Sequence, residues 1–450
     1  RREAVTVKGE KRPRELEVRE TVHGPVVTDA AAPARLVVGE AAAGLEGGAP
    51  LALRWTTLDR NDTTLVSAFR MQLAEDWGGF NRALDAWVAP PSNFVFASAS
   101  GDIGYRMAAR LPVRAEGHSG AFPVPGSGAY DWAGLVPQEA MASVLNPAKG
   151  FVVTANQRVV PPDYAYPIYW NDVVAGYRAL RIDALLRENE RHTAETMKQI
   201  QLDYTTPWAA ELKDVLAGLG PLPEEDDAWR ARLQGWGGEM AVGSEEATVY
   251  EAFYRELTTA VGRRMSLDPA EHLHWRNPSL LLSLLEGADG PPEPLDGVCD
   301  GQPPAGEAVS GCQSFAAQAF RRGVDTGKGK RWGVDVHLAT FAHAPLHESP
   351  LACLADQTVE HGGDFHTPNA GGYAMADPSF RGTYGPSYRQ IIDWGAVDEA
   401  SLFMNPGGQS GVLGSPLYSN LMPRWRDGMY LNMTTANAEE VLYATRLVGD

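Results

Sequence analysis

The apolar residues of this chain follow two different periods, which divide the sequence into β-rich and helical parts. Near the start, apolar residues recur at every second position on either side of a Lys-Gly-Glu-Lys turn: Val5, Val7, Leu16 and Val18. This period is typical of half-buried strands, so it predicts a β-hairpin. A second hairpin is predicted over 94–106, where two apolar runs flank a Ser-Ala-Ser-Gly-Asp turn.

The helical period begins after the first hairpin. Apolar residues recur at steps of three or four: Leu65, Phe69, Leu73, Trp77, Phe80, Leu84 and Trp87. This spacing predicts one kinked helix or two helices, with the break near Gly78 and Gly79. A mainly helical region is predicted from Arg178 to about Ser283, with Thr193 as an N-cap and an apolar face on a helix over 245–261.

Together these patterns predict an α+β protein in three parts. The parts are a first β-rich part over 1–177, a mainly helical insert over 178–300, and a second β-rich part over 301–450 that completes the same domain. Strands before and after a helical insert can join one sheet. The 450 residues also exceed the roughly 250–300 at which a single core stops growing, so subdomains or one large layered fold must be present.

Candidate chemistry gathers between residues 151 and 186. A short strand is predicted over 151–154, and it leads into Asn156, Gln157 and Arg158. Amides and a guanidinium at the end of a rigid strand can be aimed at a developing oxyanion. Asn156 and Arg158 are therefore candidate site residues. A structural role for Asn156, capping the turn before Pro161, stays open.

Charge excludes some functions. The formal net charge is −18, and the basic residues are scattered, which argues against a nucleic-acid partner. No apolar run reaches the roughly 18 residues of a membrane span. The chain opens on Arg1 without a signal peptide, and we expect it to be a processed or truncated piece of a longer product.

The three cysteines bear on the cellular compartment. Cys299 and Cys312 bracket a short loop rich in Gly and Pro, which predicts a disulfide between them, with two buried free thiols as the alternative. A disulfide would indicate an oxidising compartment. Cys353 is predicted to be a core thiol. The five histidines from His337 to His366 have no spacing typical of a closed zinc site.

Several motifs, read in order, resemble the penicillin acylase family of N-terminal-nucleophile hydrolases. They include VHGPVV at 22–27, NFVFASASGDIGY at 93–105, TANQRVVPPDY at 154–164, YRALRIDALL at 177–186, GGDFHTPNAGGY at 362–373 and NPGGQSGVLGSPLYSNLMPRW at 405–425. The resemblance implies a four-layer αββα fold. It also implies amide hydrolysis through an acyl-enzyme, with the first residue of a self-excised β subunit, a serine, as nucleophile and its own amine as base.

The resemblance assigns roles to residues of this chain. Asn156 would donate to the oxyanion, or Arg158 would supply positive charge there. Arg178 would help to orient the catalytic asparagine. Trp55, on a predicted strand, and Ser92 would belong to the wall of the acyl pocket.

Other family parts are expected outside this chain. Residue 1 is arginine, so we expect the serine nucleophile, the start of the β subunit and the whole α subunit to be missing, and the chain alone to be inactive. No internal serine stands in a GxSxG or SxxK context that would replace it. The family's structural calcium would need Asp163 or Asp172 and the Gly120 carbonyl, with its other ligands elsewhere. A complete calcium site, or any metal site, is not expected here.

Three functions stay open at this point. The first is a periplasmic or secreted acylase that cleaves a β-lactam side chain or a similar acyl amide. The second is an acyl-homoserine lactone acylase, which shares the fold and mechanism. The third is a catalytically dead, secreted binding protein with the same fold. In each case, apolar surface that missing segments would cover is expected to make the isolated chain poorly soluble.

Overall fold

The computed structural model divides into two compact units. They comprise Arg1–Val173 and Val174–Asp450. The structure describes residues 1–28, 50–120, 123–166, 168, 176–264, 278, 281, 311–343 and 346–434. The division into a first β-rich part, a helical insert and a second β-rich part stays a prediction.

The first unit begins with the predicted β-hairpin. Strand β1 (Arg2–Val5) pairs antiparallel with β2 (Arg14–Glu17). A second, shorter pair follows, made of β3 (Glu20–Thr21) and β4 (Gly24–Pro25). Every residue of β1 and β2 is exposed, so the expectation of a half-buried face was wrong. The alternation of apolar residues correctly indicated two strands. These strands form a sheet of their own, however, and neither face of it is buried.

Two separate helices follow, which was one of the two predicted alternatives; the other was a single kinked helix. They are α2 (Thr64–Gln72) and α3 (Trp77–Leu84), so the break lies at 73–76 and not at Gly78 and Gly79. The side chain of Asp76 accepts a hydrogen bond of 2.6 Å from the backbone N of Gly79 and caps α3. This cap fixes the start of α3, because it satisfies one of the backbone N–H groups that have no partner within the first turn of a helix. That first turn contains both glycines, so the break lies before them.

The sheet of the first unit contains the second predicted hairpin. Strands β5 (Ser92–Ala97) and β6 (Ile103–Ala108) pair antiparallel, and β9 (Ser143–Leu145) pairs with the other edge of β6. A separate short pair consists of β7 (Pro112–Val113) and β8 (Gly134–Leu135). The unit also contains the 3-10 helices η2 (Thr56–Leu58) and η3 (Gln138–Ala140).

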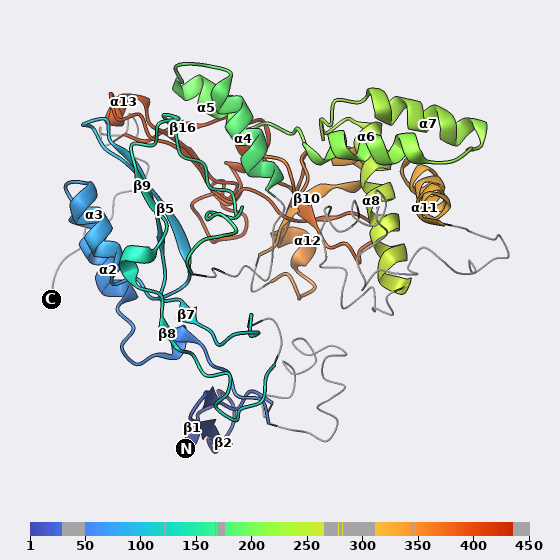
Figure 1. Cartoon of the computed structure of the whole chain (residues 1–450). Helices are drawn as coiled ribbons and strands as arrows, with labels where there is room; N and C mark the ends of the chain where they lie inside the picture. The colour runs from blue at the N-terminus through green and yellow to red at the C-terminus, as the bar shows by residue number, and fades with distance from the viewer. Residues whose placement is uncertain are drawn as a thin grey trace. The chain divides into compact units, whose positions relative to one another are not determined.

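Helix α3 lies beside this sheet (Figure 1), and aromatic side chains join the two. The ring of Phe80 lies 5.1 Å from that of Phe96, and the ring of Trp77 lies 5.7 Å from it. Gly104 makes this packing possible, because a Cβ there would lie 2.4 Å from the Trp77 ring. The helix therefore packs closely on β6 at the position that has no side chain.

The longer helices that the structure describes in the second unit precede its strands. They are α4 (Tyr177–Arg187), α5 (Ala194–Gln201), α6 (Trp208–Gly218), α7 (Glu224–Gly235), α8 (Glu245–Arg264) and α11 (Gly311–Gly327). Figure 1 shows α7 and α11 beside α8. The predicted face of α8 is buried: Val249, Tyr250, Phe253, Tyr254 and Leu257 are each at most 2% exposed. Thr193 caps α5 as predicted, in a capping box with Thr196.

The rest of the second unit is rich in short strands, as predicted. A four-stranded sheet has the order β11 (Gln357–Glu360), β10 (Leu338–Phe341), β13 (Gly382–Tyr384), β12 (Gly372–Tyr373). A three-stranded sheet has the order β14 (Arg389–Ile391), β15 (Leu402–Met404), β16 (Leu431–Asn432). Short helices connect the strands: η5 (Trp332–Val336), a π-helix, and α12 (Ala352–Ala355), α13 (Val397–Ala400) and α14 (Met422–Arg426).

The cysteine predictions have different outcomes. Cys299 lies outside the described residues, so its disulfide with Cys312 stays a prediction. Cys353 is a free and exposed thiol, so its assignment to the core was wrong. It lies on the four-residue helix α12, whose only buried residue is Ala355. Among the helices that the structure describes, none is both long and apolar enough to cross a bilayer.

Candidate active site

Asn156 lies on a tight turn in the first unit. Its φ is 68°, the left-handed conformation that asparagine tolerates better than most residues, and its side chain is exposed. Gln157 holds the turn: its Oε1 accepts a hydrogen bond of 2.7 Å from the backbone N of Ala155, and its Nε2 donates to the carbonyl of Val153 at 3.0 Å. Gln157 was not among the predicted site residues, although it lies in the same motif.

The strand predicted before this turn is absent. Residues 151–154 are described and form neither a helix nor a strand. Their run of apolar and β-branched residues resembles a strand, but they pair with no neighbouring strand in the part of the chain that the structure describes. The hydrogen bonds of Gln157 replace the strand as the support of Asn156.

The first unit contains three other candidates, Arg158, Trp55 and Ser92. Arg158 is exposed, two residues after Asn156. Trp55 is 53% exposed and directly precedes the 3-10 helix η2, so its assignment to a strand was wrong. Ser92 is the first residue of β5, and its hydroxyl donates a hydrogen bond of 3.0 Å to the carbonyl of Pro90.

Arg178 belongs to the second unit, on the first turn of α4. Burial lowers its pKa, while the nearby charges of Tyr384 and Asp364 oppose that shift. Asp364 is fully buried, and its Oδ1 accepts a hydrogen bond of 2.7 Å from the backbone N of His366. The structure therefore places a buried carboxylate in the electrostatic environment of the candidate arginine.

A buried polar cluster surrounds Asp364. The members of the motif at 362–373 that belong to it are almost completely buried: Asp364, His366, Thr367 and Asn369. The Thr367 hydroxyl accepts a hydrogen bond of 3.0 Å from the backbone N of Asp364. Gly363 makes this close packing possible, because it has a φ of 79° and a Cβ there would lie 2.2 Å from the Asn369 carbonyl.

Arg389 extends the cluster from strand β14. Its Nη2 donates a hydrogen bond of 3.0 Å to Oδ1 of Asn369, and its Nη1 donates to the Trp425 carbonyl at 2.9 Å. The arginine side chain also lies over the Trp425 ring, 4.8 Å from its centroid. Sequence reasoning missed this cluster. The motif itself was noticed, but burial of its polar residues depends on contacts between segments far apart in the sequence.

The histidines of this region pack against aromatic rings. His337 stacks on Trp332, with ring centroids 4.4 Å apart, and His361 stacks on Trp425 at 4.9 Å. Burial, and then the charges of His337 and Arg389, lower the pKa of His361 to about 3. The imidazole of His361 is therefore neutral near pH 7.

The side chains that most often bind metals do not cluster among the described residues. Among them, no group of three His, Cys, Asp or Glu side chains could hold an ion. Of the calcium candidates, Asp163 is exposed and Asp172 lies outside the described residues. A structural calcium in a longer protein stays a prediction, and no chemical step is derived from one.

Comparison with known proteins places the chain in a family. The model of the family described as penicillin amidase matches residues 1–440. The chain belongs to the penicillin amidase family. This confirms the resemblance that the motifs predicted.

Curated members of the penicillin amidase family resemble the chain over nearly all of its length. Penicillin acylase 2 proenzyme from Pseudomonas sp. (strain SE83) is 32% identical over 95% of this chain and 53% of its own length. Acyl-homoserine lactone acylase QuiP from Pseudomonas fluorescens (strain Pf-5) is 30% identical over 99% of this chain and 55% of its own length. The chain thus spans about half the length of the curated relatives it matches.

A solved structure confirms the predicted fold class. The structure of a thermostable penicillin G acylase from Alcaligenes faecalis aligns with 100% of this chain and with 82% of the acylase chain. The TM-score is 0.65 and the sequence identity is 18%. At this identity the match shows the fold alone, which is the N-terminal-nucleophile hydrolase fold of mixed helices and sheets.

Proposed function

We propose that this chain is part of an acylase that hydrolyses an acyl amide through an acyl-enzyme. The observation that carries the proposal is the family match over residues 1–440, together with relatives that are named as acylases. The proposed nucleophile is an N-terminal serine from sequence outside these 450 residues, and its α-amino group acts as the base. The chain by itself is then inactive.

Asn156 is the proposed oxyanion donor. Two features support the role: its side chain is exposed, and the turn that carries it is held by two hydrogen bonds of Gln157. An amide N–H held in place before the reaction stabilises the developing charge without a cost of reorganisation. Arg158, also exposed, is the alternative source of positive charge.

Arg178 is proposed as a positioning residue. Its partial burial and the charge of the buried Asp364 favour a fixed arginine over a mobile surface one. The role proposed for Arg178 is the one that the family resemblance implies, an arginine that supports the active site through its positive charge. Trp55 and Ser92 are proposed as parts of the acyl-pocket wall, and the large exposed surface of Trp55 is available for an apolar acyl group.

Kinetics of Asn156→Ala in the full-length precursor test the oxyanion role. Loss of one oxyanion donor typically lowers kcat about 10²–10³-fold, and we expect this loss with an unchanged fold. The assay follows cleavage of a phenylacetyl amide, and Arg158→Ala is compared in parallel. Activity that survives in Asn156→Ala and falls in Arg158→Ala would transfer the role to Arg158. Activity that survives in both would contradict an oxyanion site on this turn.

An acyl-homoserine lactone is the second candidate substrate. The relatives named for that activity are nearly as similar to this chain as the penicillin acylase, at 30% against 32% identity. Comparing kcat/KM for the phenylacetyl amide with that for a long-chain N-acyl-homoserine lactone decides between them. A precursor that cleaves neither compound would favour a binding protein. A periplasmic or secreted location is proposed with the enzyme, and fractionation of the native host would test it.

A further inference from the structure

A cavity of about 290 Å³ in the second unit is lined by residues of α4 and α6 and by the segment that follows α7. Three of its lining residues are exposed, namely Leu180, Ala184 and Ala210, so the cavity opens to solvent. Sites for small molecules typically have volumes of about 300–1,000 Å³. This cavity is at the lower end of that range, so it suits a ligand about the size of one ring.

The charges that line the cavity are unusual for this chain. Two lining side chains are basic, Arg181 and Lys213, and none of the lining residues that the structure describes is acidic. In the whole chain, Asp and Glu outnumber Lys and Arg by 57 to 39. The cavity therefore has a positive lining in a negatively charged protein, and this favours an anionic ligand.

Arg181 contributes little of that charge, because a carboxylate outside the lining already pairs with it. Its Nε donates a hydrogen bond of 3.0 Å to Oδ1 of Asp203, and its Nη2 donates one of 2.7 Å to Oδ2. This bidentate pair fixes the guanidinium and balances its charge. The net charge of the lining must come from Lys213.

Lys213 is half-buried and has no ion pair among the residues that the structure describes. Its neighbours three and four positions away on α6 carry no charge: Ala209, Ala210, Leu216 and Ala217. Side chains of a helix lean towards its N-terminus, so Lys213 lies over Ala209 and Ala210, which also line the cavity. The ammonium group thus belongs to the cavity and lacks a counterion there.

The rest of the lining offers apolar surface to the same ligand. The ring of Trp236 packs against that of Tyr250, with centroids 5.2 Å apart, and Tyr250 is 1% exposed. The buried neighbour holds the indole in place as a wall. Leu180, which is 63% exposed, adds aliphatic surface. An inorganic anion would leave these walls in water, whereas an organic anion would cover them.

We propose that this cavity binds a small organic monocarboxylate. Its carboxylate pairs with the ammonium group of Lys213, and its apolar body lies against Trp236 and Leu180. The acid that the proposed hydrolysis releases belongs to this chemical class. The binding proposal does not rest on that reaction, because none of the lining residues has a role in it.

Three probes test the proposal on the 450-residue chain by saturation-transfer NMR and titration. Benzoate combines the charge with an apolar ring, benzamide has the same shape without the charge, and acetate has the charge without the ring. Benzoate should bind, and each of the other two should bind at least about tenfold more weakly. Absence of benzoate binding, or an equal affinity for benzoate and either other probe, would overturn the proposal.

Substitutions of Lys213 test the site of binding. Lys213→Gln removes the charge at similar length and should weaken benzoate binding at least about tenfold, while Lys213→Arg should retain it. The matched control is Lys330→Gln, which removes an exposed lysine of the same unit and should leave binding unchanged. Benzoate affinity that stays the same in folded Lys213→Gln would contradict the proposal.

A blocking variant tests the cavity without changing a charge. Ala210→Trp places a large side chain on an exposed part of the lining and should abolish benzoate binding, whether or not Lys213→Gln folds. Unchanged binding to folded Ala210→Trp would place benzoate elsewhere on the protein and overturn the proposal.

Discussion

Two kinds of residue carry the candidate chemistry: exposed side chains on the turn at Asn156, and buried polar side chains around Asp364. Asn156 and Arg158 follow an apolar run, and both are exposed. Asp364 was not predicted as a site residue, although its motif was quoted. The reason is physical: a carboxylate is normally exposed, and only the packing of distant segments shows that this one is buried next to Arg178.

Burial of His361 predicts a specific dependence of stability on pH. Its pKa is about 3 in the folded protein, against an ordinary value near 6.5. The unfolded chain therefore binds a proton below pH 6.5 that the folded protein does not, and stability falls as the pH drops from about 6.5 towards 3. Between pH 7 and 5 we expect His361 to account for a loss of about 2 kcal/mol in the free energy of unfolding.

Denaturant unfolding at pH 7 and 5 checks this prediction. His361→Phe removes the titrating group and keeps a ring on Trp425, so its stability should fall less than that of the native protein over the same range. The control is Trp394→Phe, which changes an exposed aromatic side chain without a titrating group and should keep the native slope. Equal slopes for His361→Phe and the native protein would contradict the assigned pKa.

At the scale of elements, periodicity predicted the type of structure better than its boundaries. The hairpin β5-β6 and the buried face of α8 are confirmed. The break between α2 and α3 was misplaced, because the cap by Asp76 outweighs the low helix propensity of the two glycines after it. The strand over 151–154 was wrong, because β-branched residues form a strand only where a neighbouring strand pairs with them.

The contact between α8 and α11 depends on a residue without a side chain. A Cβ at Gly323 would lie 2.7 Å from the Cα and N of Phe253, both backbone atoms of α8. Gly323→Ala should therefore push the helices apart and lower the free energy of unfolding by about 1–3 kcal/mol. Thermal or denaturant unfolding measures the change.

Gly262→Ala is the matched control for that substitution. Gly262 lies inside α8, and a Cβ there would meet nothing within 4 Å. Alanine should raise stability by about 0.5–1 kcal/mol at this position, because it favours the helix. If both variants changed stability in the same direction, the contact at Gly323 would not be the cause.

At the scale of the whole molecule, the structure exposes apolar side chains in groups. On α2 and just after it, Leu65 is 75% exposed, Phe69 65% and Leu73 81%, at steps of four residues. Such a stripe favours association, so the isolated chain should self-associate. The double variant Leu65→Glu/Leu73→Glu should reduce the associated fraction in sedimentation velocity. A native chain that sediments as a single monomeric species would contradict this expectation.

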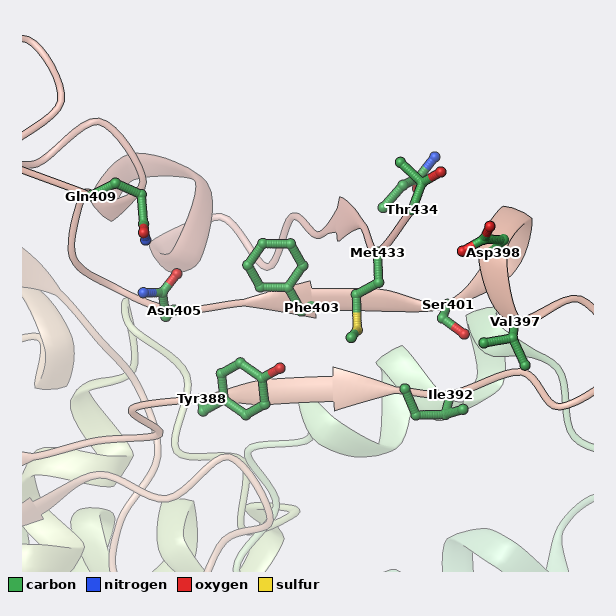
Figure 2. A pocket seen from close by; sticks show the side chains of 11 residues that line it. Tyr388, Ile392, Val397, Asp398, Ser401, Phe403, Asn405, Gln409, Met433 and Thr434 are labelled. Carbon is green, nitrogen blue, oxygen red and sulfur yellow. The ribbon is translucent and has the colours of Figure 1, made fainter. Parts of the chain in front are cut away.

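The family and the fold class were predictable from the sequence, because motifs in family order extend from residue 22 to 425. The substrate was not, since relatives of two named activities match the chain about equally well. A cavity of the second unit beside β15 was not predicted either (Figure 2). Its lining residues are spread from 388 to 434, so no single motif of the sequence indicates it.

The central proposal is that the chain is part of an acylase whose nucleophile is a serine outside these 450 residues. Trapping the acyl-enzyme tests it most directly: the full-length precursor is mixed with a phenylacetyl ester, quenched rapidly and mapped by peptide mass spectrometry. We predict one phenylacetyl group on an N-terminal serine that does not belong to residues 1–450. An acyl group on a residue within 1–450, or turnover without any acyl-enzyme, would contradict the account.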